Sequence, residues 1–266
     1  RHLVQHIEES PSIEHISNKL FQLGHEHEID GDILDMEFTP NRGDCLSING
    51  LLRDLAVFYT VKINQEIYTE KLNELQLDFE NLSESTCPKI SFLKLEIDQI
   101  PETYKNSLDN YFSDLGLNKN NFFTDVSNYL SYETGQPTHC YDASSMSGKL
   151  LFHEIEKNEE FETLLDKKIT LTGKNSVFSL NSEVINLAGV VGGKNTSCST
   201  DTKTVIVECA FFQPEAIIGK SVKYDIQSEA SHKFERGVDP ECHDKVLRRF
   251  IKLVSDHANI KDMSII

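Results

Sequence analysis

The sequence lacks several features that mark common classes of protein. No apolar run approaches the roughly 18 residues of a membrane span, and the first residues contain no apolar signal-peptide core. The six cysteines are scattered, without Cys-x-x-Cys pairs or zinc spacing, which suits reduced thiols and argues against a disulfide framework. No internal repeat or low-complexity tract is present. We therefore expect a cytoplasmic globular protein with no membrane contact.

An excess of basic residues is also missing. The chain has 26 Lys and Arg against 43 Asp and Glu, which gives a net charge of -17. Because binding of nucleic acid depends on basic groups that neutralise phosphates, this balance argues against autonomous nucleic-acid binding. Any RNA would have to be held locally or by a partner. With 266 residues, 38% of them hydrophobic, the chain is long enough for two compact domains.

The fold class predicted from the patterns is α+β. A small N-terminal helix and strand domain, residues 1–85, is expected to pack with a larger domain of mixed sheet and helices, residues 86–266. The polar, acidic stretch 64–86 has weak periodicity and is the candidate linker or edge between them. In the first domain the expected elements are a helix from the cap Ser12 to Leu23 with Gly24 as its stop, a strand from Ile33 to Phe38, and a helix from about Cys45 to Tyr59 capped by Asp44.

The second domain is expected to mix short strands with helices. Glycine, asparagine and serine separate apolar runs of strand length, and Gly116 and Gly135 follow helical patterns. The expected strands are Lys89 to Ile97, Leu150 to Ile155, Ile169 to Leu171, Ser176 to Leu180, Val184 to Leu187 and Thr204 to Phe211. The expected helices are Pro101 to Leu115, Asp125 to Thr134, Glu215 to Val222 and Pro240 to His257.

A short polar segment after a predicted helix is the first candidate for chemistry. Ser127, Asn128 and His139 bring a hydroxyl, an amide and an imidazole close together in sequence, around a Gly-Gln-Pro turn. These groups could fix a polar substrate or orient a water molecule, and a general base would need its imidazole neutral near pH 7. From spacing alone, a hydrogen-bonded structural histidine is the more frequent outcome.

Two further features lie in apolar surroundings. Glu208 interrupts an apolar strand, where a carboxylate is costly to bury unless it is hydrogen-bonded, so it either faces water at a sheet edge or lines a pocket. The glycine-rich run from Ala188 to Gly193 has neither the lysine of a P-loop nor the spacing of a dinucleotide fingerprint. Gly192 and Gly193 could let the backbone approach a ligand closely, although a tight turn is the more frequent outcome.

Six segments of the sequence, taken in order, connect these features to one family. They are Met36–Ser47, Asp125–Tyr129, Gly135–Asp142, Gly189–Gly193, Glu208–Phe212 and Ala230–Asp239. In identity and spacing they resemble the beta subunit of bacterial phenylalanyl-tRNA synthetase, specifically its N-terminal region and its editing domain of the B3/B4 type. The resemblance runs from about Ser10 to His257. The family's oligonucleotide-binding-fold insert is absent after Gly24, and the later synthetase-like and anticodon-binding domains of the beta subunit are not present.

The resemblance implies a reaction and a set of residues. The family's editing domain hydrolyses mischarged Tyr-tRNA(Phe), because a pocket for Phe cannot strongly reject an analogue with one added hydroxyl. Glu208 matches the residue that recognises the phenolic hydroxyl; His139, Ser127 and Asn128 match the polar wall near the ester and its attacking water. Gly192, Ser228 and Ala230 match residues that shape the pocket. No cofactor or metal is implied for editing, whereas ATP and magnesium serve the full synthetase. The implied partners are tRNA(Phe), the alpha subunit and the missing C-terminal beta domains.

Other classes of function remain open at this stage. The family usually has Thr where this chain has Ser127 and Ser228, and a Gly-x-Arg-Pro pattern where it reads Gly116-Leu-Asn118-Lys119. The changes at Ser127 and Asn118 favour an assembly module of the synthetase with an inactive editing site. A stand-alone trans-editing protein is a third alternative. A metal-dependent enzyme is the least favoured, because His25 and His27 form a single i, i+2 pair without further ligands at suitable spacing.

Overall fold

Helices and strands follow one another irregularly along the chain, which the computed structural model describes over residues 1–266. The main helices are α1 (Ile13–Gln22), α2 (Ile48–Leu55), α3 (Asn106–Leu115), α4 (Phe122–Thr134), α5 (Pro214–Ile217), α6 (Lys220–Tyr224), α7 (Glu229–Phe234) and α8 (His243–Ser255). The strands are β1 (Glu26–Asp30), β2 (Ile33–Glu37), β3 (Asn73–Glu74), β4 (Phe79–Asn81), β5 (Lys89–Ile97), β6 (Thr138–Asp142), β7 (Leu150–Ile155), β8 (Glu159–Glu162), β9 (Lys168–Leu171), β10 (Asn175–Leu180), β11 (Glu183–Leu187), β12 (Val191–Gly192), β13 (Thr204–Phe211) and β14 (Ile260–Ile265). The predicted α+β class is confirmed. No helix is both long and apolar enough to cross a membrane.

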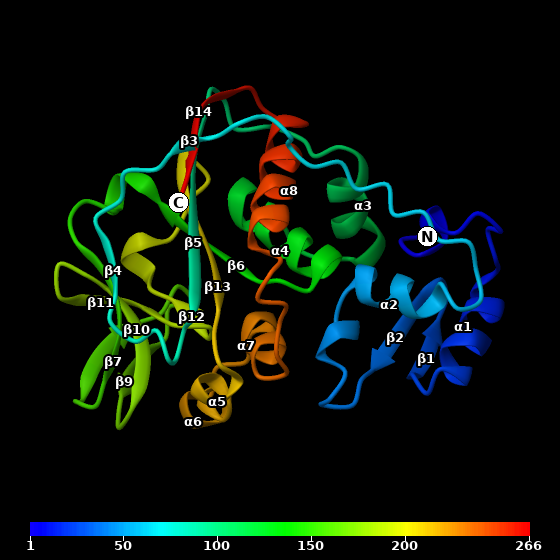
Figure 1. Cartoon of the computed structure of the whole chain (residues 1–266), viewed down its shortest axis with the longest axis horizontal. Coiled ribbons are helices and arrows are strands. Elements are labelled where there is room, and N and C mark those ends of the chain that lie inside the picture. The colour runs from blue at the N-terminus through cyan, green and yellow to red at the C-terminus, as the bar shows by residue number, and fades with distance from the viewer.

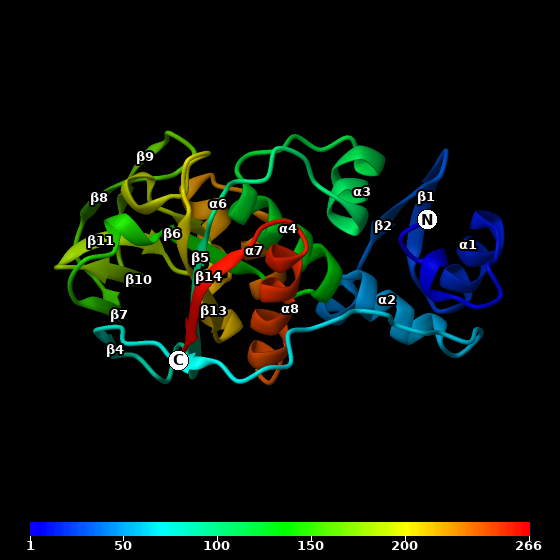
Figure 2. The same cartoon turned by 90° about the horizontal axis from the view of Figure 1, so that it is seen from above.

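The N-terminal region forms a small unit of its own around α1, α2 and the β1–β2 hairpin. Figures 1 and 2 show it at one end of the long axis, with the central helices between it and most of the strands. Ser12 caps α1 as predicted, since its side chain accepts a hydrogen bond from the His15 N–H. Leu20, Leu52 and Leu55 are fully buried in a separate cluster of nine hydrophobic residues. This unit therefore has its own core.

The cap of α2 is not the one that the sequence suggested. Asp44 lies in a preceding 3-10 turn, Gly43–Cys45, and the helix begins only at Ile48. The side chain of Ser47 caps it by accepting a 3.0 Å hydrogen bond from the Gly50 N–H. Asp44 instead pairs with Arg42. The prediction of Asp44 as the cap is therefore wrong, because an ion pair across the turn takes its carboxylate.

Replacing Ser47 by alanine should lower the free energy of unfolding by about 1 kcal/mol, since a buried helix N–H loses its acceptor. Urea unfolding followed by circular dichroism would measure the loss. Ser12→Ala is the matched control: its cap bond is 3.4 Å long and exposed, so that variant should lose less. Equal losses in the two variants would contradict the assigned role of Ser47.

Two five-stranded sheets pack face to face in the rest of the molecule. Their strand orders are β12-β11-β10-β7-β4 and β3-β14-β5-β13-β6. The larger hydrophobic cluster includes Phe92 and Tyr141 from the second sheet together with Phe152 and Phe178 from the first, so it lies between the two sheets. A second cluster joins the other face of the second sheet to α4 and α8. Strands β5, β6 and β13 of this sheet thus have one face on each core.

The predicted linker segment does more than connect the two parts of the chain. Residues 73–74 form β3 at the edge of the second sheet, and residues 79–81 form β4 at the edge of the first. Figure 1 shows the segment passing over the molecule before it reaches these edges. The segment therefore belongs to both sheets, and the boundary between residues 85 and 86 stays a prediction.

Most predicted elements are present, with different ends. The strands of 89–97 and 204–211 are confirmed to the residue, whereas α3 begins five residues later than predicted and α4 three residues earlier. The helix predicted from Glu215 to Val222 is two short helices, because Gly219 takes a φ of 79° between them. Helix α7 and strands β1, β3, β4, β6, β8, β12 and β14 were not predicted. Of these differences, β6 matters most because it carries His139.

Candidate functional site

The candidate site lies between the two sheets, on β6 and β13. The two strands are antiparallel and their register pairs His139 directly with Glu208. Since directly opposite residues of an antiparallel pair project to the same face, both side chains point toward the first sheet. The neighbours Tyr141 and Ile206 share that face and belong to the core between the sheets. The cross-strand pairing thus brings together two residues that lie 69 positions apart in the sequence.

Glu208 is buried and already hydrogen-bonded within the chain. Its side chain is 4% exposed, and the Tyr141 hydroxyl donates to its Oε2 over 2.6 Å. The Asn186 amide, from β11 of the facing sheet, donates to the Tyr141 hydroxyl over 2.8 Å and reaches Oε2 at 3.5 Å. Burial raises the pKa of Glu208 to about 8, although the hydrogen bond from Tyr141 acts in the opposite direction. The carboxyl is therefore mostly protonated at neutral pH.

His139 lies beside this carboxyl as a neutral imidazole. Burial lowers its pKa to about 4. Its ring packs edge-on against Tyr141 with the centroids 4.4 Å apart, and its Nε2 is buried without any hydrogen-bond partner. A buried polar atom without a partner is uncommon and costs free energy. The ring can therefore accept or donate a hydrogen bond to a water or substrate at this atom.

Gly192 on β12 closes the other side of the imidazole. A Cβ atom placed on this glycine would lie 2.2 Å from His139 Cε1 and 2.7 Å from Nε2. Only glycine fits there without moving the imidazole. We call His139, Tyr141, Asn186, Gly192 and Glu208 the polar cluster. Of its five members, the sequence patterns identified His139, Gly192 and Glu208.

Ser127 and Asn128 are placed differently from His139. The Ser127 hydroxyl donates to the Thr138 carbonyl over 2.8 Å and is 2.7 Å from the Thr138 hydroxyl. Thr138 projects to the opposite face of β6 from His139, because neighbouring residues of a strand alternate. Asn128 is exposed on α4 and makes no side-chain hydrogen bond. The structure therefore does not join Ser127 or Asn128 to the polar cluster by a direct hydrogen bond.

Ser228 and Ala230 lie at the start of α7, near the loop that leads to Gly192. Ser228 caps α7 by accepting a hydrogen bond from the Ser231 N–H, and its hydroxyl donates to the Val190 carbonyl over 2.7 Å. Ala230 packs on the core between the sheets. Ser228 thus helps to fix the backbone two residues before Gly192.

Sequence reasoning missed Tyr141 and Asn186 as members of the site. Tyr141 stands two residues after His139, so strand alternation would have put both on one face if β6 had been predicted. Asn186 is a polar residue inside the apolar run Val184 to Leu187, which is the same kind of signal that identified Glu208. The period of two along each strand was the available clue in both cases.

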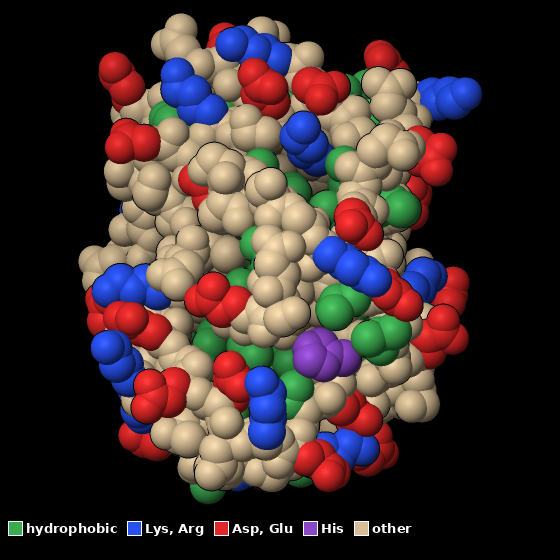
Figure 3. All heavy atoms as spheres, turned by 90° about the vertical axis from the view of Figure 1, so that its left-hand side faces the viewer, with side chains coloured by type: hydrophobic (Ala, Val, Ile, Leu, Met, Phe, Trp, Pro, Cys, Tyr) green, Lys and Arg blue, Asp and Glu red, His purple; other side chains and the backbone are tan.

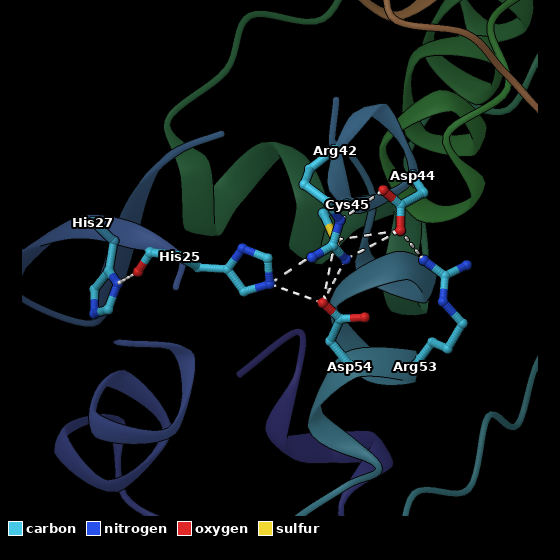
Figure 4. A network of polar contacts seen from close by, with 7 residues as sticks. All are labelled: His25, His27, Arg42, Asp44, Cys45, Arg53 and Asp54. Carbon is cyan, nitrogen blue, oxygen red and sulfur yellow. Dashed lines mark hydrogen bonds and ion pairs between the residues drawn. The ribbon is translucent and has the colours of Figure 1, made fainter. Parts of the chain in front are cut away.

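A second polar cluster lies in the N-terminal unit and is drawn in Figure 4. His25 Nε2, Cys45 Sγ and an Asp54 carboxylate oxygen lie within 4.8 Å of one another. The sequence spacing did not show this convergence. However, Arg42 Nη2 lies 2.6 Å from both Cys45 Sγ and Asp54 Oδ2. Burial, with the nearby Asp54 and Asp44, raises the pKa of Cys45 to about 12, so the thiol keeps its proton. A guanidinium among the donors and a protonated thiol fit a structural network better than a cation site.

The surface offers a mixture of charges. On the face shown in Figure 3, Lys and Arg side chains alternate with Asp and Glu, and no broad basic area is visible. The phosphates of a nucleic acid would find no uniformly positive surface on this face. The view agrees with the acidic net charge of the sequence.

Comparison with known proteins places the chain in a family. Residues 94–259, which carry the polar cluster and most of both sheets, match the model of the B3/4 domain, and the chain therefore belongs to the B3/4 domain family. It is similar to the phenylalanine–tRNA ligase beta subunit of Psychrobacter arcticus, with 32% identity over 236 residues that cover 85% of this chain and 29% of that protein. The beta subunits of Neisseria gonorrhoeae (30% identity over 239 residues, 85% and 29% covered) and Francisella tularensis (28% over 236 residues, 86% and 29% covered) are similar to it as well.

These relatives confirm the resemblance that the six sequence blocks indicated. The chain spans 29% of the length of the curated relatives that it matches. A solved N-terminal fragment of the phenylalanyl-tRNA synthetase beta subunit from Pyrococcus horikoshii is a more distant likeness, with a TM-score of 0.45 and 14% identity, and covers 99% of this chain and 73% of that one.

Proposed function

We propose that this chain is the N-terminal and editing portion of a phenylalanyl-tRNA synthetase beta subunit, and that its polar cluster hydrolyses the ester of Tyr-tRNA(Phe). The observation that supports this most is the direct pairing of His139 with the buried Glu208, with the backbone of Gly192 against the imidazole. A buried carboxyl group and a buried imidazole nitrogen without a hydrogen-bond partner thus lie on the same face of the second sheet. The proposal keeps the division at residues 85 and 86, with editing assigned to the second part.

The reaction needs only water and the ester. A water oxygen attacks the ester carbonyl carbon, the bond from that carbon to the ribose oxygen breaks, and the products are free tyrosine and the terminal ribose hydroxyl of the tRNA. Neutral His139 positions the water through its free Nε2, and the ribose hydroxyl next to the ester can assist. No hydroxyl of the chain is hydrogen-bonded to His139, which supports direct attack by water over a covalent serine intermediate.

Recognition of tyrosine is assigned to Glu208. A buried polar group that bonds the phenolic hydroxyl of Tyr is left without that bond by Phe, which separates the two substrates by roughly 1–3 kcal/mol. Ser228 and Ala230 shape the site through α7 and the loop before Gly192. Ser127 supports β6 from its other face, and Asn128 lies on the exposed side of α4, where it can meet tRNA.

The similar beta subunits support a wider assembly. The proposed partners are tRNA(Phe), the alpha subunit and the further domains of a beta subunit, in the cytoplasm. Aminoacylation, with its ATP and magnesium, belongs to that assembly and is not expected of this chain alone. Editing within it needs no cofactor.

An assembly module with a silent editing site is the second candidate. It is favoured by one observation: the acceptor oxygen of Glu208 already has a hydroxyl partner, Tyr141, within the chain. A stand-alone trans-editing protein has no such observation in its favour.

Hydrolysis of Tyr-tRNA(Phe) by the chain, alone and after addition of a bacterial alpha subunit, tests the proposal. His139→Ala should slow hydrolysis about 100-fold, because the water loses its positioning group. Glu208→Ala should slow it about 10-fold or more, because the phenol loses its partner. His153→Ala is the matched control, since His153 lies on β7 with its ring bonded to Ser179 and should leave the rate unchanged. If the wild-type chain leaves the ester intact under conditions in which a known editing synthetase clears it, the site is silent and the assembly candidate holds.

A further inference from the structure

Tyr141 places a phenol of the chain itself on the residue proposed to recognise a substrate phenol. Its hydroxyl donates to Glu208 Oε2 over 2.6 Å and accepts from the Asn186 amide over 2.8 Å. Both capacities of the hydroxyl are therefore used, and the hydrogen bonds run in one direction, from Asn186 through Tyr141 to Glu208. The side chain of a tyrosyl group bound at Glu208 would need the same kind of contact.

The ring of Tyr141 is held firmly in this position. It is 0% exposed and belongs to the core of 24 hydrophobic residues between the sheets. Its backbone pairs with Ile206 within the β6–β13 ladder, and its ring packs on His139. Swinging the phenol away from Glu208 would open a cavity in that core, which is costly. The hydroxyl is thus a fixed part of the site.

The hydrogen bonds of the Glu208 side chain are confined to one of its two oxygens, Oε2. None of the hydrogen bonds of the structure reaches its second oxygen, Oε1. In a protonated carboxyl the better acceptor is the carbonyl oxygen, and the bond from the Tyr141 hydroxyl favours Oε2 for that role, with the proton on Oε1. A substrate phenol that arrives as a donor finds the stronger acceptor taken.

We propose that Tyr141 is a specificity-determining residue of this site, whose hydroxyl competes with the substrate phenol for Glu208 and lowers the preference for tyrosyl over phenylalanyl esters. The inference rests on the proposed function, since it assigns the selectivity of the same site. It predicts that removing one oxygen atom from the chain increases discrimination between two substrates that differ by one oxygen atom.

The test compares wild type with Tyr141→Phe on Tyr-tRNA(Phe) and Phe-tRNA(Phe). The ratio of the two hydrolysis rates should rise about tenfold or more in the variant, the value of one hydrogen bond to a buried carboxyl. Tyr129→Phe is the matched control: Tyr129 is also buried and donates to a glutamate, Glu133, over 2.7 Å, but on α4 and in the other core. Its rate ratio should equal that of wild type. A ratio for Tyr141→Phe that falls, or stays within threefold of wild type, overturns the inference.

Binding of the free amino acids separates this inference from the proposed function. By titration calorimetry, Tyr141→Phe should gain about tenfold in preference for L-tyrosine over L-phenylalanine relative to wild type and to Tyr129→Phe. If no variant hydrolyses either ester but this gain is found, the proposed hydrolysis fails and the role of Tyr141 stands. If wild type hydrolyses Tyr-tRNA(Phe) and neither the rate ratio nor the binding preference changes in Tyr141→Phe, the role of Tyr141 fails and the proposed function stands.

Discussion

Replacing Arg249 by methionine should destabilise the chain by about 3–5 kcal/mol, because it leaves the Glu133 carboxylate buried without its counter-charge. The two side chains form a bidentate pair with both nitrogen–oxygen distances at 2.8 Å, and both are almost completely buried. Arg249 also donates to the Glu66 carbonyl over 2.9 Å, so the pair ties α8 and α4 to the segment that leads into β3. A loss of this size is a large part of the stability of an ordinary domain.

Urea unfolding at neutral pH would measure this loss. The double variant Arg249→Met, Glu133→Met should be less destabilised than Arg249→Met alone, since no charge is then left buried. Lys149→Met is the control, because Lys149 and Glu80 form a pair in which both side chains are about half exposed, and such pairs contribute about 1 kcal/mol or less. A loss for Arg249→Met no larger than that of the control would contradict the importance of the buried pair.

The stability of the chain should also depend on the proton of Glu208. Burial raises its pKa from 4.5 in the unfolded chain to about 8 in the folded one, so the folded state keeps a proton that the unfolded state releases. The contribution of Glu208 to the free energy of unfolding is fully present below about pH 4.5 and is lost as the pH rises through about 8. One proton corresponds to at most about 1.4 kcal/mol per pH unit, or about 5 kcal/mol across the window.

Comparing wild type with Glu208→Gln isolates this effect from other titrating groups. The glutamine keeps an acceptor for Tyr141 but cannot ionise, so its free energy of unfolding should exceed that of wild type increasingly from pH 5 to pH 8. His139 acts in the other direction, because its lowered pKa makes stability fall as the pH drops from 6.5 toward 4. A difference between the two proteins that stays constant within about 0.5 kcal/mol over this range would show that Glu208 is ionised in the folded state.

The sequence predicted the local elements better than the site. Ser12, Gly116 and Gly135 end or begin helices as expected, because a cap is decided by a few neighbouring residues. Strand β6 was missed since its five residues include His139 and Asp142 and follow a proline turn, and β14 was missed because half of its residues are polar. Both become strands by pairing with distant segments, which no local pattern contains.

For the site, the residue types were predictable but their faces were not. Glu208 on its apolar strand was correctly identified as unusual, yet its partner Tyr141 depends on the register between β6 and β13. Ser127 and His139 are near each other in sequence, which suggested one polar group. However, Ser127 bonds to Thr138, and Thr138 and His139 project from opposite faces of β6 because neighbouring residues of a strand alternate. A shift of one residue in that register would reverse these assignments.

The position of β14 has a consequence for how the chain folds. This strand lies inside the second sheet, between β3 and β5, where Ile265 pairs with both Glu74 and Leu93. These contacts join residues separated by most of the sequence, and closing such long loops slows folding. Until β14 arrives, β5 has one open edge that can pair with another chain. The sheet that carries Glu208 is therefore completed late, and the period before its completion is when the chain is most exposed to aggregation.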